Sequence, residues 1–246
     1  MRRAAQILPA ALVVAAVLAA IPGRAGAQAA PGRAADSVRV EQRRALWQAM
    51  TELERLEIAA AGVARPTSDS AALLAADRRR AQDTLVAALD RAVLDEPWGP
   101  DELAQLRIAF PGSRLLNVYA ARLAERRGDA AAALATVDAL LRKAPADADL
   151  QRWRGGLLER LGRSAEAEQA YARALDLEPE SDSTFRALQR LAESRGTLAG
   201  LLAQVERLRI RLPASHALAD HETEVRQRLG ARSARRDSAP TSGGRR

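Results

Sequence analysis

The chain has 246 residues, no cysteine and a formal net charge of +7. Without cysteine it forms no disulfide, so an apolar core must stabilise the folded part. The surplus positive charge is confined to the two ends, residues 1–27 and 231–246, and the body between them is close to neutral. This distribution argues against a nucleic-acid-binding surface.

Residues 1–27 have the features of a signal peptide. Arg2 and Arg3 precede an apolar run from Ile7 to Ile21, and Ala25-Gly26-Ala27 fits a cleavage site. The apolar run is shorter than the roughly 20 residues that span a bilayer. We therefore expect export by general secretion, cleavage after Ala27 and a periplasmic or secreted bacterial protein. An uncleaved anchor is the alternative, and the signal peptide would then be the only membrane contact.

Residues 28–62 are expected to form a short linker and a long amphipathic helix. The linker covers residues 28–35, and Asp36 or Ser37 caps a helix that ends near Ala61. Charged residues surround its apolar stripe, which contains Leu46, Met50, Leu53 and Ala60. Two interpretations stay open: helix 36–61 self-associates as a coiled coil, or it packs back on the rest of the chain as an N-terminal cap.

Residues 68–112 are expected to form two further helices. The first covers about 70–94, and a loop with two prolines follows it, in which Trp98 fills an apolar gap. Asp101 then caps a shorter helix that ends near Phe110. The segment shares a closing proline with the repeats that follow but lacks their alanines, so it is interpreted as a degenerate first repeat.

Two series of residues recur at an interval of 34 beyond this point. The series are Pro111, Pro145, Pro179 and Pro213, and Gly128, Gly162, Gly196 and Gly230. Apolar residues between them follow helical periodicity, with the glycines ending one helix and the prolines the next. Residues 113–230 are therefore expected to form three helical hairpins and a capping helix that Gly230 stops. Residues 231–246 are expected to be a disordered basic tail.

The second hairpin resembles a tetratricopeptide repeat (TPR), a family with this period. Gly155, Ala167, Tyr171, Ala174 and Pro179 stand where the family consensus has glycine, alanine, an aromatic, alanine and proline. The resemblance implies an all-α fold: a right-handed TPR-like solenoid of helical hairpins, preceded by N-terminal helical segments.

The third hairpin departs from this pattern. Gln189 stands where Gly155 stands, and Leu201 stands where Ala167 stands. Because larger side chains keep helix backbones apart, we expect the helices of this hairpin to be splayed or to cross at a different angle.

Motifs for catalysis or cofactor binding are not found in the sequence. It contains no nucleophile elbow, no glycine-rich phosphate loop and no zinc-protease motif. His216 and His221 are five residues apart, which does not place them on one helix face. We therefore expect neither an enzyme nor a metal or cofactor site.

The resemblance implies that a partner binds the concave groove lined by the first helix of each hairpin. Arginines at these positions suit the carboxylates of an acidic peptide, through bidentate hydrogen bonds. They are Arg122, Arg126, Arg152, Arg186 and Arg190. A row of glutamates, Glu125, Glu159 and Glu193, would neutralise part of their charge.

The leading functional prediction is an exported scaffold that binds a protein or peptide in this groove. The alternative is a structural subunit of a cell-envelope assembly that contacts partners through its N-terminal helix. An accessory to a cell-wall enzyme is a third, less favoured interpretation.

Overall fold

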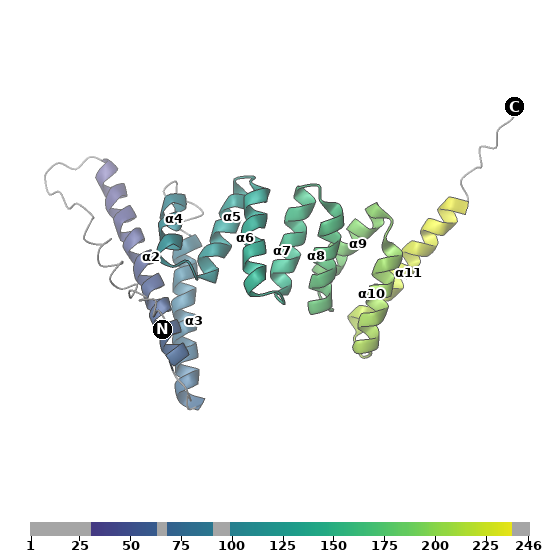
Figure 1. Ribbon diagram of the computed structural model, residues 1–246, viewed down its shortest axis with the longest axis horizontal. Coiled ribbons are helices and arrows are strands. Elements are labelled where there is room, and N and C mark those ends of the chain that lie inside the picture. The colour runs from purple at the N-terminus through teal and green to yellow at the C-terminus, as the bar shows by residue number, and fades with distance from the viewer. Residues whose placement is uncertain (1–30, 63–67, 91–98, 238–246) are drawn as a thin grey trace, which may run out of the picture. The chain divides into compact units, whose positions relative to one another are not determined.

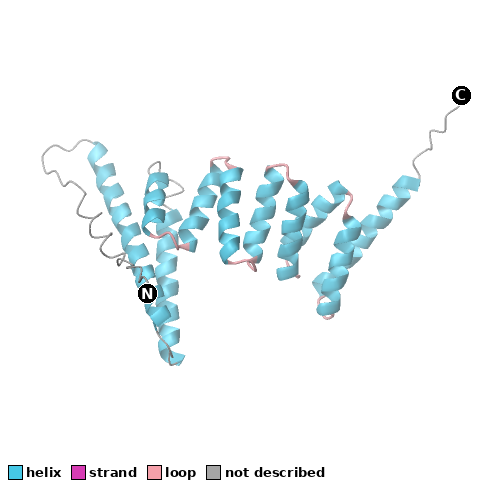
Figure 2. Ribbon diagram, viewed as in Figure 1, coloured by secondary structure: helices cyan, strands magenta, loops and turns pink. Residues whose placement is uncertain are grey.

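A computed structural model describes residues 31–62, 68–90 and 99–237, and within these ranges the chain is all-helical, with no strand (Figures 1 and 2). This confirms the all-α prediction. The predicted signal peptide and Trp98 lie outside the described residues. No helix in the described ranges is long and apolar enough to cross a membrane. The chain divides into two units, residues 1–123 and 124–246, which are described separately.

The first unit is built around the helix pair α2 (Pro31–Gly62) and α3 (Ser68–Leu89), which pack against each other. Helix α4 (Gly99–Ala109) and the start of α5 (Arg114–Arg126) complete it. Its core consists of Leu46, Met50, Leu53, Leu85, Leu89, Leu103, Leu106, Phe110, Leu116 and Tyr119. The predicted apolar stripe of the first helix therefore faces this core.

A buried carboxylate fixes α2 to α4. The side chain of Glu102 is 2% exposed and accepts a hydrogen bond from Trp47 Nε1 at 2.5 Å. The Arg43 guanidinium lies 2.5 Å from its other oxygen and supplies the counter-charge that a buried carboxylate needs. The Trp47 ring also packs against Phe110, with ring centroids 5.9 Å apart.

Two helices begin earlier than predicted, and each has a proline in its first turn. Helix α2 starts at Pro31, so residues 31–35 are helical and not part of a linker. Helix α4 starts at Gly99, with Pro100 and then Asp101 in its first turn. Proline suits these positions because the first turn of a helix needs no N–H donor from it. Helix α3 is described as far as Leu89, and its predicted end at Leu94 lies outside the described ranges.

The second unit contains helices that pack against their neighbours in chain order, and α9 additionally packs against α11. The helices are α6 (Ala130–Lys143), α7 (Ala148–Arg160), α8 (Ser164–Leu177), α9 (Asp182–Arg195), α10 (Leu198–Arg211) and α11 (His216–Asp237). Pro145, Gly162, Pro179, Gly196 and Pro213 lie between these helices, as the two 34-residue series predict.

The glycine turns of the three hairpins have the same geometry. Gly128, Gly162 and Gly196 have φ of 80°, 73° and 78°, a left-handed conformation that only glycine adopts without strain. After each glycine, the next backbone N–H bonds to a carbonyl five residues back; the bond from Asp129 to Ala124 is one example. This is the Schellman ending of a helix, and it explains why one glycine recurs in each repeat.

The proline turns also repeat, and they extend the period beyond the glycine series. The carbonyl of Phe110 accepts a bond from the N–H of Ser113, and equivalent bonds recur at 34-residue intervals. The residue that ends each turn caps the next helix. The side-chain oxygens of Ser113, Asp147 and Ser215 each accept a hydrogen bond from the backbone N–H three residues further along the chain. Helix α4 therefore ends as α6, α8 and α10 do. Its identity as a degenerate repeat remains a prediction.

Helix α11 continues through Gly230, where the sequence had predicted its end. It reaches Asp237, so residues 231–237 are helical and not disordered. Gly230 does not have a positive φ, unlike the three turn glycines. A glycine inside a helix costs only about 1 kcal/mol, and helix-forming residues follow Gly230. A glycine therefore ends a helix only where the chain must also turn back. Residues 238–246 lie outside the described ranges.

The outer side of α11 differs from that of α9. Gln189 and Ala192 are buried on α9, whereas the residues 34 positions later, Thr223 and Arg226, are exposed. The inner positions stay apolar and buried, with Leu218 and Val225 both 0% exposed. Helix α11 therefore covers α9 and α10 with one face and presents a polar face outward.

The two complete hairpins of this unit are packed differently. Helices α7 and α8 lie close over most of their length, whereas α9 and α10 approach each other over a shorter stretch (Figure 1). The third hairpin is therefore packed less closely than the second, as its larger side chains predict.

Candidate functional site

The glutamate row and the arginines of the first helices form ion pairs between consecutive repeats. Glu125, Glu159 and Glu193 each lie three residues before a turn glycine, in the last turn of α5, α7 and α9. Each binds an arginine of the next first helix; we call these pairs the ladder. The distances are 2.5 Å for Arg160–Glu125, 2.7 Å for Arg190–Glu159 and 2.6 Å for Arg228–Glu193.

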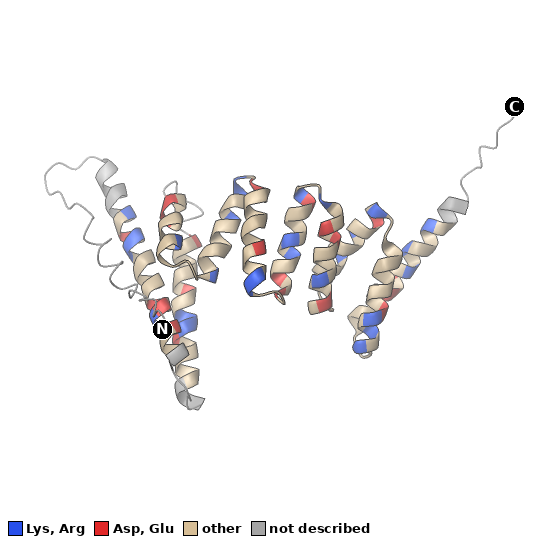
Figure 3. Cartoon of the chain, in the orientation of Figure 1, with Lys and Arg blue, Asp and Glu red and all other residues tan. Residues whose placement is uncertain are grey.

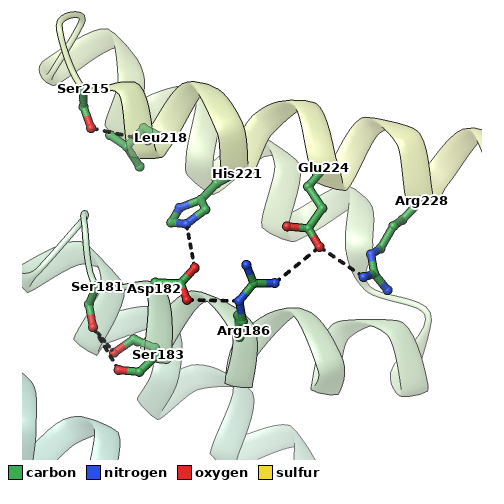
Figure 4. Close-up of polar contacts among 10 residues, drawn as sticks. Ser181, Asp182, Ser183, Arg186, Ser215, Leu218, His221, Glu224 and Arg228 are labelled. Atoms are coloured by element: carbon green, nitrogen blue, oxygen red, sulfur yellow. Dashed lines mark hydrogen bonds and ion pairs between the residues drawn. The ribbon is translucent and has the colours of Figure 1, made fainter.

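A second set of charges continues the ladder between α9 and α11 (Figure 4). Arg186 Nε lies 3.0 Å from Asp182 Oδ2, and its Nη1 lies 3.7 Å from Glu224 Oε1. The same glutamate oxygen lies 3.1 Å from Arg228 Nη2. Asp182, Arg186, Glu224 and Arg228 therefore form a continuous chain of alternating charge across the two helices.

The structure gives each predicted binding arginine a partner. Arg152 lies 2.6 Å from Asp149, while Arg186 and Arg190 pair as described above. In the first unit, the exposed Arg122 lies over the Tyr119 ring at 5.8 Å. Arg126 is also engaged. The face is therefore mixed in charge, and Figure 3 shows basic and acidic residues interspersed along these helices.

These pairs are accessible to solvent and therefore exchangeable. The side chains of Arg152, Arg186 and Arg190 are 46%, 58% and 66% exposed. An ion pair at such a position contributes only about 0–1 kcal/mol, because water screens it and two long side chains must be held still. A carboxylate from a partner can replace the internal one at little cost.

Gly156 leaves a gap in the arginine rows, above a buried tyrosine. The corresponding positions in the neighbouring first helices are Arg122 and Arg190. A Cβ on Gly156 would lie 3.6 Å from the hydroxyl oxygen of Tyr171. Burial raises the pKa of Tyr171, as does the nearby Glu159 carboxylate, while Arg190 and Arg152 oppose the shift. Both arginines therefore act on this hydroxyl, and the phenol stays protonated.

Two residues of this face make contacts that the sequence did not predict. Trp153 donates a hydrogen bond from Nε1 to Glu125 at 2.9 Å and so orients the first carboxylate of the ladder. His221 is buried against α9, and its ring stacks on Phe185. Trp153 and His221 lie one and three 34-residue periods after Tyr119. This spacing is a signal in the sequence that ring side chains at these positions face the preceding repeat.

The described residues contain no group of three or more His, Asp or Glu side chains placed to hold a metal ion. His221 points toward Asp182, and the structure places no other histidine beside it. The chemistry available on this face is hydrogen bonding and charge pairing.

Comparison with known proteins assigns no role to this face. No family model matches the chain, and no curated protein shows significant similarity to it. What the protein does must be inferred from these side chains and their contacts.

Proposed function

We propose that the chain is an exported TPR-like scaffold that binds a protein or peptide segment on the face of its first helices. In this proposal residues 113–230 form a right-handed solenoid, and the protein acts by binding and not by catalysis. The observation that carries it is the repetition of turn and cap hydrogen bonds at 34-residue intervals, the period of TPR arrays. Arrays of stacked hairpins present extended surfaces suited to binding other chains.

The favoured partner is an acidic segment. Arg152, Arg186 and Arg190 offer planar guanidinium groups that bind carboxylates through two parallel hydrogen bonds. The partner carboxylates Asp149 and Asp182 are 74% and 61% exposed, and Glu159 is 25% exposed. A carboxylate-bearing segment could therefore exchange with Asp149, Asp182 or Glu159 without disturbing the buried core.

A second candidate function is that of a structural subunit of a cell-envelope assembly, contacted through the first unit. Large apolar side chains remain exposed on its helix pair: Val40 at 48%, Ile58 at 66% and Leu73 at 69%. A second copy of the chain or another subunit could cover these side chains, which is the observation behind this candidate.

A crosslinked pull-down from native envelopes tests both candidates. The mature protein is compared with the triple variant Arg152→Glu, Arg186→Glu and Arg190→Glu. The matched control reverses the same number of charges on second helices: Arg142→Glu, Arg173→Glu and Arg207→Glu, all exposed positions. Circular dichroism and a thermal melt first establish that both variants fold.

The proposal expects one partner to be captured by the wild type and the control but lost by the first triple variant. If both variants capture the same proteins as the wild type, the first-helix face is not the site. Deletion of residues 31–62 then tests the second candidate, which expects the partner to be lost.

A further inference from the structure

His221 joins the last helix to the preceding repeat through a buried ring stack. Its side chain is 6% exposed, and its ring lies parallel to that of Phe185, with centroids 3.7 Å apart and planes inclined by 9°. Phe185 is itself 0% exposed. The docking of α11 on α9 therefore depends on an aromatic contact that the imidazole makes in its neutral form.

The two imidazole nitrogens have different surroundings. Nε2 faces Asp182 Oδ1 at 3.5 Å, and Nδ1 is buried without a hydrogen-bond partner. A neutral ring with its proton on Nε2 directs this proton to the carboxylate and leaves only a lone pair unsatisfied at Nδ1. A second proton would create a buried N–H donor with no acceptor, which costs roughly 1–3 kcal/mol before any charge is considered.

The charged groups around His221 act in both directions. From α9, Asp182 favours the imidazolium and Arg186 opposes it, and from α11 itself Glu224 favours it. From α10, Arg209 approaches the neighbouring Glu222 and neutralises it. Arg186 also binds the second oxygen of Asp182 and so weakens its attraction for the ring. Burial is the largest influence, and it lowers the pKa of His221 below its ordinary value.

We propose that His221 is a pH-sensitive latch whose protonation releases α11 from α9. When α11 is released, the imidazole is in water and titrates at its ordinary pKa of about 6.5. The docked form holds the proton less well, so docking is fully stable above this value and weakens as the pH falls below it. Release would also withdraw Glu224 and Arg228 from the first-helix face. An effect on partner binding rests on the proposed function, but the release itself does not.

Nuclear magnetic resonance tests the latch without any partner, because the chain has only two histidines. We expect the His221 ring signal to titrate below the ordinary histidine pKa of about 6.5. We also compare the amide exchange rates of residues 218–229 with those of α9, after correction for intrinsic exchange. Below about pH 6.5 this ratio of rates should rise as the pH falls, by at most about tenfold per pH unit.

Two variants isolate the titrating group. His221→Gln keeps a donor toward Asp182 but cannot titrate, so the acid-dependent rise in exchange should disappear. His216→Gln, on the same helix, should retain it. The latch is wrong if His221 titrates at or above the ordinary histidine pKa of about 6.5, or if α11 and α9 keep the same relative protection from pH 7 to pH 5. Persistence of the acid step in His221→Gln would also overturn it.

A third variant covers the case in which His221→Gln leaves α11 undocked at every pH. Asp182→Asn removes the carboxylate that favours the imidazolium, while the stacked ring remains. The His221 signal should then titrate at still lower pH, and the loss of protection in acid should become larger. An unchanged titration would show that Asp182 does not face the ring, and the latch would be rejected.

Discussion

The second and third hairpins have the same turns and different interiors. Gly155 lets α7 approach α8 so closely that a Cβ at this position would lie 2.7 Å from the Tyr171 ring. The third hairpin has Gln189 at this position, 4% exposed, and its helices contact each other over a shorter stretch. The comparison shows that the turns determine where each helix ends, while one or two small residues determine how closely the pair packs.

The largest effect is expected from Gly155→Ala, which tests the close hairpin directly. The new methyl group would overlap the Tyr171 ring, and the helices must separate, so the free energy of unfolding should fall by about 2–3 kcal/mol. Urea denaturation measures it. Gly156→Ala is the matched control, since its Cβ meets only the Tyr171 hydroxyl at 3.6 Å, and better helix propensity should make it neutral or slightly stabilising. Equal destabilisation by both variants would show that packing at Gly155 is not special.

The next effect concerns how the open hairpin is held in place. Gln204 of α10 donates hydrogen bonds of 2.8 Å to the Ala172 carbonyl and to Asp176, both on α8. Gln204→Leu keeps the volume and removes both bonds, so stability should fall by about 1–2 kcal/mol. Exchange of α10 amides should rise more than that of α7 amides. A uniform rise would contradict a local role for Gln204.

The shared turns predict equal effects in the two hairpins. Gly162→Ala and Gly196→Ala each force a left-handed conformation on alanine, so each should cost about 1 kcal/mol. Gly230→Ala should have the opposite sign and stabilise by up to about 1 kcal/mol, because Gly230 lies inside α11. Thermal unfolding measures all three. A destabilising Gly230→Ala would indicate that the chain turns at this glycine after all.

The smallest effect separates size from polarity in the open hairpin. Gln189 Nε2 is buried and has no hydrogen-bond partner. Gln189→Leu keeps a large side chain and removes the unsatisfied donor, so stability should rise by about 0.5–1 kcal/mol while the helices stay apart. Urea denaturation gives the stability, and a crystal structure of the variant gives the spacing. A closer α9–α10 pair would mean that polarity, and not volume, separates them.

The sequence predicted the parts of the fold that depend on local backbone chemistry. The glycine and proline series located six helices because each residue acts on its own turn. The predicted helix end at Gly230 was wrong because a glycine ends a helix only where a following helix packs back against the one before it. This is a condition of the tertiary structure, which the local sequence does not contain. Pro31 misled the prediction because an initial proline is compatible with both a linker and a first turn.

The candidate face was harder to predict, because its partners come from different repeats. The arginine positions follow from the 34-residue interval, but which carboxylate each one contacts depends on helix packing. Glu159 and Arg190 are 31 residues apart and still bind each other, at 2.7 Å. The role of His221 could not be inferred from its neighbours in sequence, since Phe185 and Asp182 lie on another helix.

The polar outer side of α11 has a consequence for assembly. If the last helix of a hairpin array had an apolar outer face, a second chain could pack on it as a further repeat would. Chains would then join head to tail into filaments. Thr223 and Arg226 occupy the positions where α9 has buried Gln189 and Ala192, so a second chain docking there would have to desolvate a guanidinium already bound to Glu206. The polar outer side of α11 therefore disfavours head-to-tail joining of chains at this face.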